Sequence, residues 1–218
     1  MFWKQYIKLI RLIDTCKQCL ACPMIEVRGC TPTRPYIPAT NHPIVFLGEP
    51  PTVEGSFWNV NKEYRSRRIL FEAVLPHTTC LNDEDSLAEF VNSGYYYLEA
   101  LKWPLKRTYK ELAPKLRALV DHTAQDHLRS ELELLGPRAL ICLGTAGKDL
   151  LHCLFENHFL KEPLRMLRNE RFILTLEGKS LPILFSYHPS NFQQAATMIK
   201  DVVSYVHDLG PVTAQNEH

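Results

Sequence analysis

The stretch IVFLGEPP (residues 44–51) decides the fold that we predict for this chain of 218 residues. Its four apolar residues run up to Gly48, and Glu49 and two prolines follow. A short apolar run that is bounded by glycine and proline predicts a buried strand ending in a turn. The turn after this first strand therefore carries a carboxylate.

Four more strands are predicted further along the chain, with helical patterns between them. They fall at residues 95–98, 139–143, 172–176 and 182–187. Strands that alternate with helices predict the α/β class, here a three-layer αβα fold with a central, mainly parallel sheet. Ligands of such sheets bind at the carboxyl ends of the strands, where residues 48–51 and 188–191 are expected to lie.

The helices are predicted from the spacing of their apolar residues. Residues 2–13 are expected to form an amphipathic helix, and Ser66 is expected to cap the helix that follows the first strand. Within residues 109–135 the apolar phase changes, which predicts two helices broken near residues 121–123.

Length and composition favour one domain over residues 1–218. We expect a helical, Cys-rich and Pro-rich segment at 1–42 and an αβα core at 43–210. A formal net charge of +1 excludes a strongly basic, non-specific nucleic-acid binder, so DNA would have to bind a local patch. Because neither a secretory signal nor an apolar run of about 20 residues is present, we expect a cytoplasmic, monomeric protein without a membrane partner.

Four of the seven cysteines lie close together near the N-terminus. They are Cys16, Cys19, Cys22 and Cys30. Thiolates at this density can bind a structural zinc ion or an iron-sulfur cluster. Buried or incidental thiols explain them equally well, because no second cysteine pair follows at finger or ribbon distance. Both hypotheses stay open, and the chemistry that we expect needs no cofactor.

Three motifs together resemble the family 4 uracil-DNA glycosylases. Residues 44–51 resemble the family's first motif, Gly-Glu-Ala-Pro-Gly, and Tyr-His-Pro-Ser at 187–190 resembles its closing His-Pro-Ser motif. Residues 135–144 look like the Pro-x-x-Ile-x-x-Leu-Gly strand that precedes the closing motif. The order and spacing agree over about residues 16–191. The resemblance implies a uracil-DNA glycosylase-like fold and DNA as the partner.

The resemblance also implies a site that holds an extruded base while its glycosidic bond breaks. His188 is expected to donate a hydrogen bond to the base oxygen as negative charge develops there, and Glu49 to act in catalysis beside it. The expected base-binding residues are Gly48, Pro51, Phe57 and Trp58, of which one aromatic ring would stack on the base. The expected DNA contacts are Arg65, Ser66, Arg67, Arg68, Lys102, Ser190 and Asn191, with Lys106 and Arg107 extending the positive charge.

Glu99 departs from the family's pattern at a catalytic position. The family's segment Asn-x-x-Lys-Cys-Arg-Pro-Pro corresponds to residues 99–104, so Glu99 replaces the asparagine that reads the uracil edge. An ionised carboxylate only accepts hydrogen bonds, which suits a base with an amino or hydroxyl donor, or it can position water as a general base. Pro50 stands where some branches of the superfamily have a catalytic aspartate. The candidates for activating water are Glu49, Glu54 and Glu99.

The family's iron-sulfur site cannot be carried over to this sequence. Trp103 replaces one cluster-binding cysteine, and the next such position, near Ala124, is not cysteine either. Cys22 and Cys30 as substitute ligands are a hypothesis.

The favoured function is a DNA glycosylase that removes uracil or a modified pyrimidine and leaves an abasic site. Hydroxymethylated or glucosylated cytosine would make it a defence enzyme against phage DNA. Two alternatives stay open: a non-catalytic DNA-binding member of the fold, and a hydrolase of free nucleotides that uses the same crevice. Formation of abasic sites would distinguish the glycosylase from the non-catalytic DNA-binding protein. Release of the base from DNA rather than from a free nucleotide would distinguish the glycosylase from the nucleotide hydrolase.

Overall fold

The protein is built around a five-stranded sheet in the order β2-β1-β3-β5-β4. A computed structural model describes residues 2–28, 30–34, 36–53, 55–61, 64–75, 84–99, 101–155, 158–168, 170–189 and 194–208. β1 (Ile44–Gly48) pairs in parallel with β2 (Tyr95–Glu99) and β3 (Ala139–Leu143). β3 pairs in parallel with β5 (Lys179–Ser186), and β4 (Phe172–Leu176) is antiparallel to β5. The predicted, mainly parallel sheet is confirmed.

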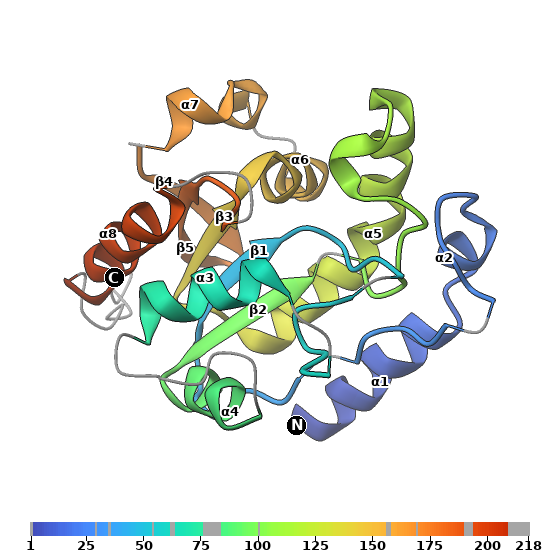
Figure 1. The fold of residues 1–218 in the computed structure, drawn as a ribbon, viewed down its shortest axis with the longest axis horizontal. Coiled ribbons are helices and arrows are strands. Elements are labelled where there is room, and N and C mark those ends of the chain that lie inside the picture. The colour runs from blue at the N-terminus through green and yellow to red at the C-terminus, as the bar shows by residue number, and fades with distance from the viewer. Residues whose placement is uncertain are drawn as a thin grey trace.

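Helices cover both faces of this sheet and so form the predicted three layers (Figure 1). Residues of α3, α4 and α8 pack against one face, and residues of α5 and α6 pack against the other. The helices and 3-10 turns are α1 (Phe2–Asp14), α2 (Lys17–Ala21), α3 (Arg65–Val74), α4 (Glu84–Asn92), η1 (Tyr109–Glu111), α5 (Pro114–Leu135), α6 (Gly144–Phe155), η2 (His158–Lys161), α7 (Leu164–Leu167) and α8 (Ala195–Asp208). Among the described residues, no helix has the length and apolar character needed to span a membrane.

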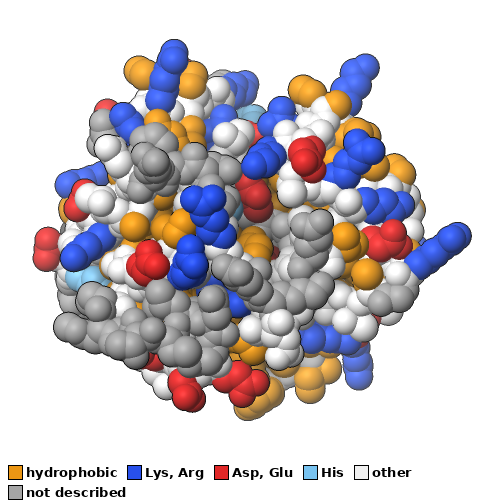
Figure 2. Space-filling model, viewed as in Figure 1, with side chains coloured by type: hydrophobic (Ala, Val, Ile, Leu, Met, Phe, Trp, Pro, Cys, Tyr) orange, Lys and Arg blue, Asp and Glu red, His pale blue; other side chains and the backbone are white. Residues whose placement is uncertain are grey.

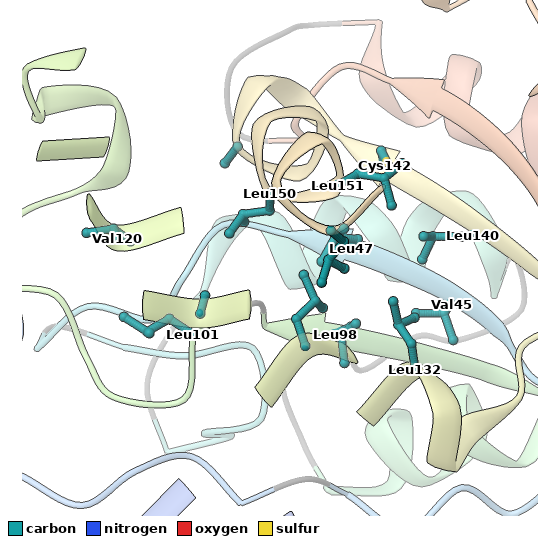
Figure 3. Packing of buried hydrophobic residues seen from close by; sticks show 14 of the residues in the cluster. Val45, Leu47, Leu98, Leu101, Val120, Leu132, Leu140, Cys142, Leu150 and Leu151 are labelled. Atoms are coloured by element: carbon teal, nitrogen blue, oxygen red, sulfur yellow. The ribbon is translucent and has the colours of Figure 1, made fainter. Parts of the chain in front are cut away.

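The side chains of β1 explain why both faces need a cover. All five residues of the strand are buried, and successive side chains point to opposite faces. Val45 and Leu47 belong to the core that includes α5 and α6, whereas Ile44 and Phe46 belong to the core that includes α3 and α8. Figure 3 shows Leu47 close to α6 and Val45 near Leu132 of α5.

The predicted break between two helices near residues 121–123 is wrong. The structure has the short turn η1 and then one continuous helix, α5, with Pro114 in its first turn and Gly136 in a left-handed conformation (φ 50°) after its last residue. The apolar phase changes because a polar residue takes a buried position in the middle of the helix. Both carboxylate oxygens of Asp121 accept from the Tyr109 hydroxyl at 2.7 Å.

A buried ion pair joins the segment after β2 to α5. Nζ of Lys102 lies 2.7 Å from Oε2 of Glu131, and the two side chains are 1% and 0% exposed. The Tyr96 hydroxyl donates to the other oxygen of Glu131 (2.8 Å) and accepts from the Tyr36 amide (3.1 Å). Because both charges have lost their water, each depends on the other for compensation.

Removing one member of this pair should destabilise the fold strongly. Among the described residues, Glu131→Gln leaves the Lys102 ammonium buried with only the partly ionised Glu99 as a nearby negative group, so we expect the free energy of unfolding to fall by about 3–5 kcal/mol in urea titrations. The double variant Lys102→Met/Glu131→Leu should recover most of that loss, because no buried charge remains. The exposed pair of Arg68 and Glu72, 3.9 Å apart, is the control. Glu72→Gln should cost less than about 1 kcal/mol. Equal losses in both single variants would contradict the expectation.

Candidate active site

The carboxyl ends of the parallel strands bring the three predicted catalytic residues to one edge of the sheet. Gly48 at the end of β1 pairs with Glu99 at the end of β2, and Glu49 follows Gly48 directly. His188 comes two residues after the end of β5, which pairs with β3 next to β1. Glu99, Glu49 and His188 therefore follow one another along the edge where sheets of this type bind ligands.

Two glycines allow close approaches along this edge. Gly144, the first residue of α6, has φ 71°, and a Cβ atom there would lie 2.8 Å from the Cβ of His188. A Cβ atom on Gly48 would collide with the hydroxyl of Tyr97. Side chains at either position would therefore displace residues of the site.

Glu99 is fully buried and holds its proton more tightly than an exposed carboxyl does. Its Oε1 accepts a 2.6 Å hydrogen bond from the Phe57 amide. Burial raises the pKa of Glu99 to about 7, although Lys102, the Phe57 amide and the Thr33 hydroxyl favour the charged form. Near neutral pH both forms are therefore populated, and the carboxyl is an acceptor alone only in its ionised form.

His188 and Glu49 both interact electrostatically with Lys110 on η1. Burial and, to a smaller extent, the charge of Lys110 lower the pKa of His188 to about 4. Burial raises the pKa of Glu49, and Lys110 opposes that shift. At neutral pH the imidazole is thus neutral, with one N–H donor. Lys110 lies far from both motifs in the sequence, where no local pattern marks it.

The two aromatic residues predicted to stack on a base both lie against other rings. Phe57 is fully buried, and its ring stacks on Tyr97 with centroids 4.0 Å apart and planes at 7°. Trp58 stacks on Tyr36 at 5.0 Å and 5°, and its indole N–H donates to the Tyr97 carbonyl at 3.1 Å. Trp58 and Pro51 line an open cavity of about 520 Å³ beside the first motif. A base can reach the covered face of Phe57 only after Tyr97 has moved.

The structure separates the residues that were predicted to contact DNA. Arg65 and Arg68 are exposed on α3. Ser66, Arg67 and Lys102 are buried, so DNA contact is wrong for them in this structure. Ser66 is also not a helix cap, because α3 begins at Arg65. Outside the described residues lie Ser190, Asn191 and the water-activation candidate Glu54.

Arg67 has an internal role that the run of basic residues did not reveal. Its Nη1 donates to the carbonyl oxygens of Phe57 (2.8 Å) and Asn59 (3.0 Å). Burial lowers the pKa of Arg67, while Tyr64 and Glu99 raise it. Because successive helix residues point about 100° apart, neighbours in such a run face different sides. The guanidinium therefore holds the loop after the first motif instead of a phosphate.

Positive charge does not form a continuous surface on the face seen in Figure 2. Lys and Arg side chains are interspersed there with Asp and Glu side chains. Near the first motif, Lys106 and Arg107 are exposed and line a small pocket with Thr52 and Val53. Any attraction of a phosphate backbone therefore comes from a few local cations.

Two of the clustered cysteines meet a histidine that the sequence analysis did not single out. The ligand atoms of Cys16, Cys19 and His127 all lie within 4.8 Å of one another. The Cys19 sulfur is 3.8 Å from Nδ1 and 3.9 Å from Nε2 of His127. Cys22 is buried at the end of α2, whereas Cys30 lines the open cavity. Cys22 and Cys30 are not part of the group that Cys16, Cys19 and His127 form.

Comparison with models of protein families gives one match, which covers most of the chain. The model of the uracil DNA glycosylase superfamily matches residues 34–210. The chain belongs to this superfamily. Members of the uracil DNA glycosylase superfamily are DNA glycosylases and act on DNA. A search of curated proteins found no match to this member.

The iron-sulfur cluster of family 4 enzymes does not fit this member of the superfamily. Trp103 stands where those enzymes have a cluster cysteine, and its indole N–H donates to the Ile13 carbonyl at 3.1 Å. Ala124, at the next cluster position, is fully buried in the core. A tetrahedral ion with zinc-like bonds of 2.0–2.3 Å sets its ligand atoms about 3.3–3.8 Å apart. The Cys19 sulfur and the ring nitrogens of His127, at 3.8 and 3.9 Å, lie at the upper limit of this spacing.

The stability of this superfamily member should fall as the pH rises through 7. The pKa of Glu99 is raised from 4.5 to about 7, so the folded chain binds this proton more tightly than the unfolded chain. The resulting stabilisation is complete below pH 4.5 and is lost as the pH rises to 7. Glu99→Gln cannot ionise, so it should flatten the melting temperature between about pH 5 and 8.

Asp121 provides a second test of the same effect, because burial also raises its pKa to about 7. Asp121→Asn should also reduce the fall in melting temperature with rising pH. In the double variant the melting temperature should depend on pH less than in either single variant. An unchanged slope in Glu99→Gln would mean that this carboxyl does not titrate in the range.

Proposed function

We propose that this chain is a DNA glycosylase that hydrolyses the N-glycosidic bond of a damaged or modified base and leaves an abasic site. The observation that carries the proposal is the neutral imidazole of His188 at the same sheet edge as Glu49 and Glu99. A neutral N–H donor stabilises negative charge on a departing base without first having to take up a proton. Membership of the superfamily supports the same reaction.

In the proposed reaction, the bond between C1′ and the base nitrogen breaks and its electron pair stays on the base. The His188 N–H donates to the base oxygen on which this charge accumulates. A water molecule supplies hydroxide to C1′, and its proton passes through a carboxylate and finally neutralises the base. Atoms and charge balance without a cofactor.

Glu49 is the better candidate for the carboxylate that activates water. It is only partly buried, and Lys110 favours its charged form. Glu99 is fully buried and already accepts from the Phe57 amide. We infer that Glu49 orients the water and that Glu99 positions the loop that carries Phe57.

The replacement of asparagine by Glu99 widens the range of bases that we propose. In its charged form the carboxylate accepts from an amino or hydroxyl group, and in its protonated form it can also donate. Modified cytosines therefore belong among the candidate substrates beside uracil. Removal of hydroxymethylated or glucosylated cytosine would serve defence against phage DNA.

Purified protein should form alkali-labile abasic sites in DNA that carries one of the candidate bases. The panel contains uracil, hypoxanthine, hydroxymethyluracil, and hydroxymethylated and glucosylated cytosine, each in single-stranded and duplex DNA. On the base that is cleaved, His188→Ala should lower turnover by about 100-fold or more, because it removes a transition-state donor. Glu49→Gln should also lower turnover strongly.

His122, which is exposed on α5, supplies the matched histidine control, and His122→Ala should retain turnover. DNA binding without abasic sites across the whole panel would instead support the non-catalytic reading. Base release from free nucleotides alone would support the nucleotide hydrolase.

We further propose that Cys16, Cys19 and His127 bind one structural zinc ion, with water as the fourth ligand. The distances support a mononuclear site, and mixed Cys and His ligands are typical of structural zinc. The ion would join α2 to α5 and so hold the N-terminal segment on the core. It takes no part in the reaction.

Metal analysis of the purified protein should find about one zinc per chain and no acid-labile sulfide. Removal of the metal with a chelator should lower the melting temperature, because zinc binding contributes to folding. Cys19→Ser and His127→Ala should each lose the metal, whereas Cys153→Ser, a cysteine outside the group, should keep it. Iron with an equal amount of sulfide would contradict the single-ion site, and metal-free protein would leave the thiols as core residues.

A further inference from the structure

One face of the Phe57 ring is already covered by a ring of the chain itself. Tyr97 lies parallel to Phe57 at the close separation that a stacked nucleobase would adopt, with centroids 4.0 Å apart. The Phe57 ring also packs against Phe71 and Phe90, at 5.8 and 5.5 Å. Phe57 is 0% exposed, so its ring offers no accessible face to a base.

Tyr97 reaches this position from the edge of the site. It lies on β2 two residues before Glu99, so both side chains point to the same face of the sheet. Its hydroxyl passes over Gly48, where any side chain would collide with it. The same hydroxyl lies beside that of Tyr64 and within the electrostatic reach of Glu49 and Glu99. The tip of the ring therefore lies among the groups that the proposed reaction uses.

We propose that Tyr97 occupies the position of the extruded base on Phe57, so that a base enters only by displacing this ring. The inference rests on the proposed glycosylase function and deepens it in two respects. Tyr97 becomes a specificity residue, because only a base that binds tightly enough keeps the ring displaced. The substrate is a pyrimidine, because the space that a phenol ring vacates matches one six-membered ring and is too small for a bicyclic purine.

A ring that must be displaced lowers the affinity for every ligand of that position. The apparent dissociation constant is the intrinsic one divided by the fraction of molecules in which the position is open. A smaller side chain at residue 97 should leave a cavity bounded by Phe57, so that the position is open in every molecule and the apparent dissociation constant equals the intrinsic one. Tyr97→Phe keeps the ring and should leave the position closed, which separates the effect of the ring from that of the hydroxyl.

The first arm of the test measures binding of free ligands by the full-length protein and requires no catalysis. The probes are phenol, uracil, cytosine and adenine in calorimetric titrations. Tyr97→Val, with a β-branched residue suited to a strand, should bind phenol and the two pyrimidines at least about tenfold more tightly than the wild type. Adenine should show no such gain, and Tyr97→Phe should behave like the wild type.

Tyr95→Val is the matched control. Tyr95 lies on the same strand and the same face, and its ring packs against Phe90 and Phe46. Its loss should not improve binding of any probe. Tyr97→Leu serves in the same titrations if circular dichroism shows that Tyr97→Val is unfolded. Equal affinities in the wild type and the folded position-97 variants, or equal gains in Tyr95→Val, would overturn the proposal.

The second arm repeats the excision panel with the same variants. On DNA with a modified pyrimidine, Tyr97→Val should raise kcat/KM by about tenfold or more and accept additional pyrimidines. If Tyr97→Val binds the probes more tightly but no variant excises a base, the proposed role of Tyr97 is supported and the glycosylase function is rejected. If the wild type excises a base but Tyr97→Val changes neither probe binding nor kcat/KM, the glycosylase function is supported and the proposed role of Tyr97 is rejected.

Discussion

The hydrogen bond from the Phe57 amide to the buried carboxyl of Glu99 is the constraint on which the rest of the site depends. It fixes the loop after β1 to the end of β2. The guanidinium of Arg67 binds the carbonyl of the same residue, so α3 holds the loop from the other side. Backbone groups that would otherwise be buried without partners are thereby satisfied by two side chains that have themselves lost their water. The backbone of Phe57 and the end of β2 keep their relative positions because of this double attachment.

Burial raises the pKa of the two carboxyls of the edge, Glu49 and Glu99, and lowers that of His188, so all three shifts favour neutral forms. The pKa of Glu99 rises to about 7, and that of His188 falls to about 4. Desolvation is the largest cause in both cases, since it disfavours the charged form of an acid and of a base alike. A site with little fixed charge suits a reaction in which negative charge appears only as the base departs. Lys110 is the cation that influences His188 and Glu49 from outside the two motifs.

Local patterns in the sequence predicted the sheet and the edge of the site, but not what covers the site. β1 and β3 were predictable because short apolar runs ended at glycine, and His188 because it follows a strand. The continuity of α5 was missed because Asp121 is buried through a hydrogen bond that no spacing reveals. Arg67 looked like a DNA contact, since the side of a helix on which a residue lies depends on what packs there. Lys110 and His127 join their groups through tertiary contacts alone, so no neighbouring residues could have identified them.

Trp103 attaches the N-terminal helix α1 to the core of the protein. Its indole N–H donates to the carbonyl of Ile13 near the end of α1, and its ring packs in the core. An indole is made with the chain itself. The attachment of α1 through Trp103 therefore forms as the chain folds and depends on no bound group.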